Sequence, residues 1–317
     1  MKKNFLLVIM LMLTMIFAGC GEEQEMFDNT TTTTREIFYF MTDDAGRDVV
    51  LYTKPDRLVV TSASFLEPLH AVEGNIVGRP DSKTQMPDWA KKIESIGQVY
   101  QVDTEKIIAC KPDLVILNKG MNEKLVNVLD ENKIPSMVID MKSYDDVKRN
   151  IETFGEITEH SDKAAKIIDD MDEKINAIIK KLPKDKHDVA ILHSTAQGLS
   201  VQLEGSIAGS IVKMFGWNNV ADGMTPMQNN PDAAPYSMET LTQQNPEIIF
   251  VTSMGDIEEI KSSMQKNIRD NPAWKSINAI KNGKIYYLPQ DLFLLSPGLR
   301  YPEAVEYIAK LIYPKMK

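Results

Sequence analysis

Residues that commonly hold bare metal ions or form disulfides are scarce in this sequence. The chain of 317 residues contains two cysteines and four histidines. A protein site for bare manganese or zinc usually takes about three histidines and a carboxylate, yet His160 and His187 fall in or beside one long helical segment. Cys110 lies on the apolar side of a helix pattern, so we expect a buried, unreactive thiol. The sequence therefore disfavours a bare-metal binding protein.

Motifs of enzymes and of nucleic-acid binding proteins are also missing. The sequence has no Gly-x-Ser-x-Gly, no catalytic Cys/His pair, no Gly-x-Gly-x-x-Gly and no P-loop. The net charge is -9, the isoelectric point is about 5.1, and no basic stretch of the kind that binds nucleic acid is present. The segment GSIAG at 205–209 resembles an anion nest ahead of a helix, but we expect it to serve packing. We therefore expect neither an enzyme nor a nucleic-acid partner.

The N-terminus has the composition of an export signal. Met1–Lys3 is basic, and Phe5–Phe17 is an almost unbroken apolar run of 13 residues, shorter than the roughly 20 needed to cross a bilayer. The run ends in FAGC, which resembles a bacterial lipobox whose cysteine, Cys20, carries lipid. We expect a signal peptide over 1–19, removal of which leaves the protein anchored at the extracytoplasmic side of the cell membrane. The alternative is a plain secretory signal with an incidental cysteine.

Segments with strand and helix patterns alternate along the rest of the chain. An acidic, threonine-rich stretch predicts a flexible tether over 20–45, and residues 37–53 read as a β-hairpin with its turn at Asp44–Gly46. The strand and helix patterns after the hairpin predict two mostly parallel α/β lobes of similar size, over 46–159 and 183–317.

One long helical pattern separates the two lobes. Apolar residues recur at spacings of three and four over 160–182, and no Gly or Pro interrupts them until Pro183. A helix of this length spans about 30 Å. We expect it to join the lobes as a stiff link, the alternative being an ordinary surface helix of one lobe.

Two stretches of the sequence, 134 residues apart, share one pattern. TEKIIACKPDLVIL at 104–117 and METLTQQNPEIIFV at 238–251 each have a Glu in second place and a Pro seven residues after it, followed by an apolar run. Their position on either side of the long helix favours the linking role for that helix. By itself the repetition predicts a duplicated helix–strand unit.

Taken together, these segments resemble the substrate-binding lipoproteins of ABC importers for iron-siderophores, haem and cobalamin. The resemblance covers the chain from about Arg47. It is carried by the lipobox, by DDAGRDVVL with KPDRLVV near the start, and by NPAWKSINAIKNGKIYYLPQDLF at 271–293. It implies a ligand cleft between the lobes, a monomer without a cofactor, and an ABC permease dimer with its ATPase as partner.

The resemblance also implies a role for the Glu of each repeated stretch. In the family, one Glu on each lobe docks onto basic residues of the permease dimer, and the pattern falls here on Glu105 and Glu239. Two carboxylates far apart can set register on a symmetric partner. The alternative is that each acid only stabilises the first turn of its helix, by about 0.3–1 kcal/mol.

Ligands of such a fold are expected on loops that follow the strands, between the lobes. The candidate ligand-binding residues are Ser62, Phe65, Tyr100, Lys119, His193, Tyr236, Met254 and Arg300.

Iron ligation is a separate question. The haem receptors of the family use a Met in the N-terminal lobe and a His after a strand of the C-terminal lobe, positions that fall here on Tyr100 and Met254. Phenolate and thioether can both bind haem iron, but neither family ligand is kept. Tyr100 could instead be an aromatic wall of the cleft and Met254 a packing residue, and His193 could be a ligand or a structural donor.

The sequence does not decide which class of chelate is transported. Arg300, Lys119 and Arg79 are the candidate cations of the cleft, and because arginines are few, a highly charged citrate-type chelate is disfavoured. Ferric siderophore and haem rank level as the transported ligand. A corrinoid ranks behind them, because Trp217 and Trp274 are expected to pack inside the C-terminal lobe.

Overall fold

The computed structural model describes residues 35–82, 86–195, 198–228 and 230–316. The expected signal peptide, the lipidation site at Cys20 and most of the expected tether lie outside these residues. Within the described part, Glu36–Lys317 forms one compact unit. None of its described helices combines the length and apolarity needed to cross a bilayer.

The expected hairpin lies near the start of the described part of the chain. Strands β1 (Tyr39–Thr42) and β2 (Asp48–Leu51) pair antiparallel. The tether boundary at residue 45 is therefore wrong, because β1 already lies in the fold. The carboxylate of Asp43 fastens the hairpin to strand β8, accepting a hydrogen bond from the backbone N–H of Val138 at 3.0 Å.

The N-terminal lobe is built on a six-stranded sheet in the order β6-β5-β4-β3-β7-β8. All neighbours are parallel except β5 and β6. The strands are β3 (Leu58–Val60), β4 (Ile76–Asp81), β5 (Glu94–Gln98), β6 (Gln101–Val102), β7 (Leu114–Asn118) and β8 (Ser136–Ile139). The helices are α1 (Leu66–Ala71), α2 (Asp88–Lys91), α3 (Thr104–Ala109), α4 (Val126–Glu131) and α5 (Tyr144–Thr158). Cys110 is buried as expected, and burial raises the pKa of its thiol.

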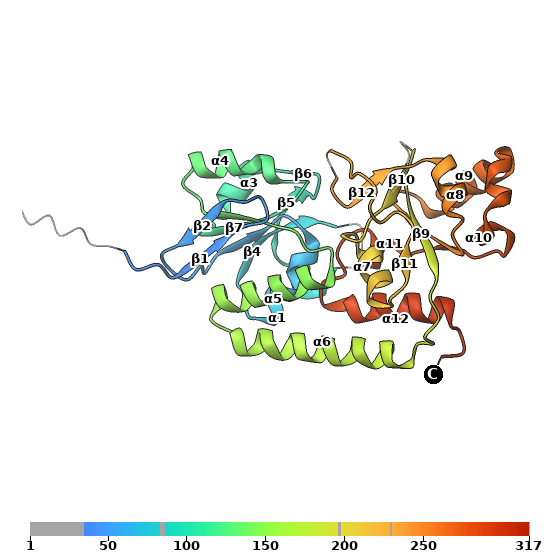
Figure 1. Cartoon of the computed structure of the whole chain (residues 1–317). Helices are drawn as coiled ribbons and strands as arrows, with labels where there is room; N and C mark the ends of the chain where they lie inside the picture. Colours follow the sequence, from blue (N-terminus) through green and yellow to red (C-terminus); the bar gives the residue numbers. More distant parts are fainter. Residues whose placement is uncertain (1–34, 83–85, 196–197, 229, 317) are drawn as a thin grey trace, which may run out of the picture. The chain divides into compact units, whose positions relative to one another are not determined.

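The long helix α6 (Ser161–Lys181) has 21 residues and joins the lobes as predicted. Ala164, Ile168, Met171 and Ile175 form its buried stripe. It packs against α5 of the N-terminal lobe and against α12 of the C-terminal lobe, and it runs beneath both lobes (Figure 1). A helix that packs on both lobes leaves them little freedom to hinge.

The sheet of the C-terminal lobe has the order β12-β10-β9-β13-β14, with β11 paired to β9. Its strands are β9 (Asp188–Thr195), β10 (Gly198–Gln202), β11 (Asn218–Asn219), β12 (Ala233–Pro235), β13 (Ile248–Ser253) and β14 (Ile285–Tyr287). Strands β9, β13 and β14 are parallel, but β10 runs antiparallel to β9 and to β12. This sheet is therefore mixed. Its antiparallel part was not expected because β10, with the sequence GLSVQ, is short and polar.

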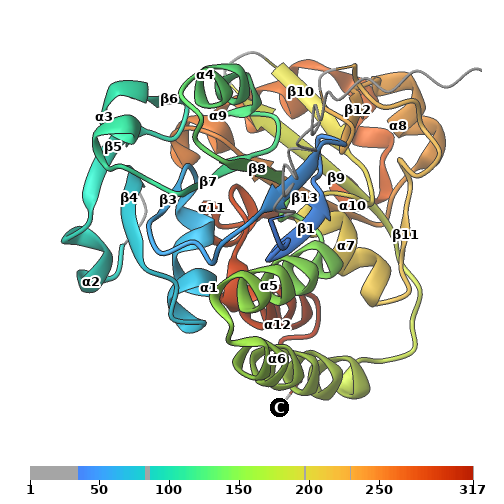
Figure 2. The ribbon, with the colours of Figure 1, turned by 90° about the vertical axis from the view of Figure 1, so that its left-hand side faces the viewer.

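Helices cover the strands of this lobe in the described part of the chain. They are α7 (Ile207–Met214), α8 (Met238–Gln244), α9 (Ile257–Asp270), α10 (Asn278–Lys281), α11 (Gln290–Phe293) and α12 (Tyr301–Ile312). Trp217 and Trp274 are buried in the lobe, as expected. A view from the side shows α5, α12 and α6 stacked on the side of the molecule opposite α4 and α8 (Figure 2).

The GSIAG segment serves packing. A Cβ atom on Gly209 would lie 2.1 Å from the backbone oxygen of Leu203, and one on Gly205 would lie 2.3 Å from Oδ1 of Asp232. The side chain of Ser206 accepts the hydrogen bond of the Gly209 N–H at 3.0 Å. The N-terminus of α7 is thus capped from within the chain.

Candidate ligand-binding cleft

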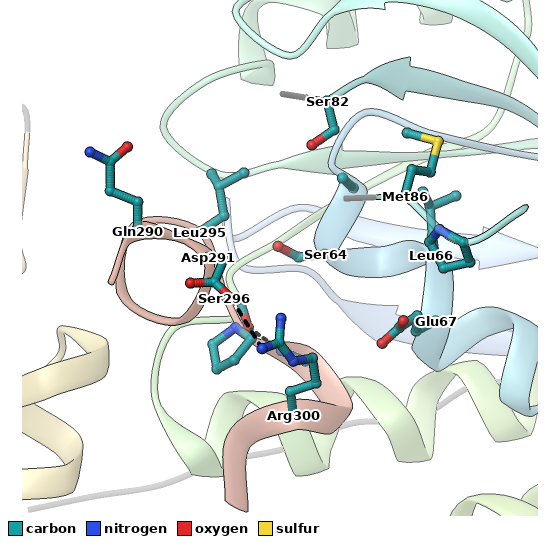
Figure 3. Close-up of a pocket in the computed structure, with 14 residues that line it drawn as sticks. Ser64, Leu66, Glu67, Ser82, Met86, Gln290, Asp291, Leu295, Ser296 and Arg300 are labelled. Carbon is teal, nitrogen blue, oxygen red and sulfur yellow. Dashed lines mark hydrogen bonds and ion pairs between the residues drawn. The ribbon is translucent and has the colours of Figure 1, made fainter. Parts of the chain in front are cut away.

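A pocket lined by both lobes lies at the carboxyl ends of their parallel strands. The N-terminal lobe contributes the loop after β3 with the start of α1, and the two sides of the loop after β4. The C-terminal lobe contributes the segment from Gln290 to Arg300, after β14. Figure 3 shows these two walls facing each other. The pocket encloses about 90 Å³, so it holds only part of a ligand whose whole site would take roughly 300–1,000 Å³.

The lobes touch beside this pocket at Gly298. Its φ is +54°, and a Cβ atom there would lie 3.2 Å from the backbone oxygen of Ser64 and 3.5 Å from the ring of Pro68. Glycine satisfies both the left-handed backbone and the close approach. The SPG sequence at 296–298 therefore sets how near the C-terminal loop comes to the N-terminal lobe.

Arg300, one of the predicted ligand-binding residues, lines the pocket and is paired with carboxylates. Its guanidinium donates from Nε and Nη2 to Glu303 at 2.7 and 2.8 Å, and from Nη2 to Asp291 at 3.1 Å. These carboxylates raise the pKa of Arg300, and the hydrogen bond from Arg300 lowers the pKa of Glu303. Asp291 also lines the pocket. Asp291 was not among the residues predicted from the sequence, because its separation of nine residues from Arg300 does not indicate a pair.

Two predicted residues, Ser62 and Phe65, are not available to a ligand. Phe65 is fully buried, with its ring 6.5 Å from that of Phe154. Ser62 is 1% exposed and caps the turn after β3 by accepting a hydrogen bond from the N–H of Ser64. Both predictions are wrong for direct contact. Ser64, Leu66 and Glu67 line the pocket in their place, because the chain turns into a helix immediately after the strand.

Tyr100 is freely exposed on the turn between β5 and β6, with 69% of its surface accessible. The side chain of Asn122 donates to the backbone oxygen of Val99 at 3.0 Å, which ties this turn to the loop after β7. Met121 on that loop is also exposed. Lys119, on the same loop, is half-buried and its N–H donates to the oxygen of Ile139.

Met254 is exposed at the end of β13, with 57% of its surface accessible. Its N–H donates to the oxygen of Ser194. The side chain of Gln290, a pocket residue, donates to the oxygen of Gly255 at 2.6 Å and to the hydroxyl of Ser253 at 3.2 Å. The Met254 loop is thus fixed to one wall of the pocket.

Tyr236 is packed within the C-terminal lobe. Its ring stacks on Trp274 with a centroid distance of 6.2 Å, its hydroxyl lies 2.8 Å from the sulfur of Met238, and burial raises its pKa to about 12. It does not line the pocket. Its predicted role in ligand contact has no support here, and its packing holds the start of α8.

His193 is a half-buried residue of β9. Its Nδ1 lies 3.0 Å from the hydroxyl oxygen of Thr252, and that hydroxyl can donate to the backbone oxygen of Leu192 at 3.3 Å. With the hydroxyl proton used in this way, the Thr252 oxygen accepts from Nδ1–H, and Nε2 keeps a lone pair. Burial lowers the pKa of His193. The structural-donor interpretation therefore accounts for Nδ1 and leaves Nε2 as the atom that could meet a ligand.

The buried imidazole should make stability fall in acid. Above pH 6.5, the ordinary pKa, His193 is neutral in both the folded and the unfolded chain. As the pH falls below 6.5, the unfolded chain takes up the proton first, so the free energy of unfolding decreases. In His193→Asn, which keeps a donor toward Thr252, the loss of unfolding free energy between pH 7.5 and pH 5.0 should be smaller, as measured by urea titration. An equal loss in both proteins would contradict this.

A second contact ties the lobes together away from the pocket. Nζ of Lys142, after β8, lies 2.5 Å from Asp232 of the C-terminal lobe and 3.4 Å from Asp140. Burial alone would lower the pKa of Lys142, but the two carboxylates outweigh it and raise the pKa. This cation, too, is already neutralised.

Glu105 and Glu239 occupy the same position in their helices. Each is exposed and is the second residue after the N-cap, which is Asp103 for α3 and Ser237 for α8. Figures 1 and 2 place α3 and α8 on the upper side of the molecule, one on each lobe, and α6 on the lower side. No cluster of three or more His, Cys, Asp or Glu side chains suited to a metal ion occurs in the described parts of the chain.

Comparison with known proteins gives a consistent family. The profile of the family described as periplasmic binding protein matches residues 58–292. The uncharacterised ABC transporter substrate-binding lipoprotein YvrC of Bacillus subtilis is 26% identical, over 99% of this chain and 98% of its own. The Fe(3+)-citrate-binding protein YfmC of the same organism is 25% identical, over 97% and 96%. The structure of Staphylococcus aureus IsdE complexed with haem has the same fold, with a TM-score of 0.72 at 24% identity, over 81% of this chain and 98% of IsdE.

Proposed function

The chain belongs to the periplasmic binding protein family, and we propose that it is the substrate-binding component of an ABC importer for iron chelates. The observation that carries the proposal is the pocket lined by loops of both lobes at the carboxyl ends of their strands, where ligands of open α/β sheets bind. The chelate is cargo, and no resident cofactor is required. Because α6 packs on both lobes, capture needs only a small closure.

The transported ligand is a ferric siderophore or haem, with a corrinoid as the alternative. The exposed side chains of Tyr100, Met121 and Met254, which lie on loops at the carboxyl ends of the strands, offer apolar surface to a bulky ligand. Among the relatives, YfmC is a ferric-citrate-binding protein and IsdE binds haem. A bare-metal binder or an enzyme is the weakest alternative, since the family consists of binding proteins.

Binding without turnover is the direct test of this function. Protein lacking residues 1–20 is titrated with a ferric trihydroxamate, haem, ferric citrate and cyanocobalamin, with tryptophan fluorescence and absorbance as readouts. We expect one of the iron chelates to saturate at one equivalent and to be recovered chemically unchanged. Saturation by none of the four, or conversion of the bound compound, would contradict the proposal.

Tyr100 should act as a wall of the site. Since its ring is exposed, stacking on a chelate should contribute about 1.4 kcal/mol, so Tyr100→Ala should weaken binding about tenfold and Tyr100→Phe less than about twofold. Tyr52→Ala, on the N-terminal hairpin, is the matched control and should bind normally. If haem binds with a Soret shift that Tyr100→Phe alters, the phenolate is instead an iron ligand.

Delivery requires contact with a permease. In our proposal Glu105 and Glu239 dock the loaded protein on an ABC permease dimer, which is driven by its ATPase. Lipid on Cys20 holds the monomer at the extracytoplasmic side of the membrane and raises its concentration near the permease. The exposure of both glutamates, their equal positions in α3 and α8, and the placement of these helices on the side opposite α6 support the docking role.

A further inference from the structure

Carboxylates dominate the charged side chains around the inter-lobe pocket. Among the residues that the structure describes, the charged ones that line it are Glu67 from the N-terminal lobe and Asp291 and Arg300 from the C-terminal lobe. Figure 3 shows Glu67 across the pocket from the other two. Glu303 adds a third carboxylate through its two hydrogen bonds to Arg300. With one guanidinium and three carboxylates, the group carries two excess negative charges at neutral pH.

The hydrogen bonds of Arg300 offset its positive charge on one edge of the guanidinium. Its Nε and Nη2 donors are both occupied, in a two-pronged contact with Glu303 that matches the planar fork of the guanidinium. The contact of Nη2 with Asp291 holds the group from the other side. An anionic ligand would have to displace a carboxylate from Arg300 or accept repulsion from the three acids.

Two other cations, Arg79 in strand β4 and Lys142 after β8, are also paired with carboxylates. Arg79 lies 2.6 Å from Asp81, and Lys142 lies between Asp140 and Asp232. Among the described residues of the loops after the strands, Lys119 has no carboxylate within ion-pair distance. One lysine does not reverse the negative charge of the pocket.

We propose that this pocket selects ferric chelates of zero or positive net charge over anionic chelates, with Asp291, Glu303 and Glu67 as the specificity-determining residues. The selection deepens the proposed function and depends on it, because it requires the chelate to enter the inter-lobe pocket. The acids act through charge, so their effect should weaken as salt screens them.

A matched series of chelates isolates charge from shape. A linear ferric trihydroxamate that ends in a primary amine carries one positive charge. N-acetylation makes it neutral, and N-succinylation gives it one negative charge, while the iron-binding part is unchanged. At low ionic strength the wild-type protein should bind the cationic and neutral forms at least about tenfold more tightly than the anionic form. In 0.5 M salt this ratio should shrink to within about threefold, since the Debye length falls to only a few Å.

Two variants test which residues impose the selection. Asp291→Asn with Glu303→Gln removes both acids that hold Arg300, and the affinity ratio should fall to about threefold or less. Glu67→Gln, on the other lobe, should reduce the ratio independently and keeps the proposal testable if the double variant folds poorly. The control is Glu306→Gln, which removes an acid of α12 that pairs with Lys310 outside the pocket and should leave the ratio unchanged.

The outcomes separate the charge selection from the proposed function. The charge selection is supported if the cationic and neutral chelates bind more tightly than the anionic one, and if only the pocket variants lower this affinity ratio. Tight binding of ferric citrate or haem together with weak binding of all three trihydroxamates overturns the selection and leaves the importer function standing. Equal affinity across the series, or a ratio that Glu306→Gln changes as much as the pocket variants do, also overturns it. Binding of no chelate overturns both.

Discussion

A protein that carries both Glu105→Lys and Glu239→Lys should bind its chelate with unchanged affinity and fail to deliver it. Each substitution reverses the charge of an exposed side chain at the start of a short helix. Like charges facing the basic docking surface of a permease cost several kcal/mol, and each 1.4 kcal/mol is a factor of ten. Uptake of the chelate that the purified protein binds should fall to the background of cells lacking the protein.

The control for this experiment is a charge reversal on the opposite side of the molecule. Asp169→Lys with Glu173→Lys changes the net charge equally, on exposed positions of α6, and uptake should be normal. Single Glu105→Lys and Glu239→Lys variants should each lose part of the uptake, because one lobe still docks. Lost chelate affinity in the double variant, or normal uptake, would rule out the docking role.

Replacing Asp43 by Ala should cause the largest loss of stability among single substitutions in the N-terminal hairpin. The carboxylate is completely buried and accepts hydrogen bonds from the N–H groups of Ala45, Arg47 and Val138 and from the guanidinium of Arg47. Removal leaves these donors unpaired, together with a half-buried cation, at a cost of about 3–5 kcal/mol. Urea titration followed by circular dichroism measures the change in unfolding free energy.

Asp48→Ala is the matched control for that variant. Asp48 is exposed and accepts a single hydrogen bond from Thr42 in the same hairpin, so its loss should change stability by about 0.5 kcal/mol or less. Burial alone would raise the pKa of Asp43, but the hydrogen bonds from Arg47 and Val138 outweigh it and lower the pKa. Its contribution is therefore present at neutral pH and is lost as the pH falls through the folded-state pKa. A cost below about 1 kcal/mol for Asp43→Ala would contradict the anchoring role.

The regular elements were largely predictable from the sequence. The pattern over 160–182 predicted α6 to within one residue at each end, because an uninterrupted apolar stripe and the following Pro183 leave few alternatives. Strands β10, β11 and β12 were missed, because they are short and depend on neighbours distant in the sequence for their pairing.

The candidate site was predicted less well than the fold. Placing residues on loops after strands correctly brought Arg300 to the pocket and left Tyr100 and Met254 exposed. The same rule failed for Phe65, because the chain turns into a helix within three residues and the ring points into the core. Asp291 and Glu67 could not be found, since their importance arises only when loops from two lobes meet.

By itself the sequence determined the two α/β lobes and the stiff helix between them, because these follow from the spacing of apolar residues and from turn residues over many positions. The family was indicated separately, by the resemblance of several motifs in their order along the chain. The tertiary structure alone decided the electrostatic character of the pocket. Arg300 counts as a free cation in the sequence, whereas in the fold its guanidinium is shared by Asp291, nine residues before it, and Glu303, three residues after it. Charge depends on distances in space, which fall off within a few Å, and only the folded chain sets those distances.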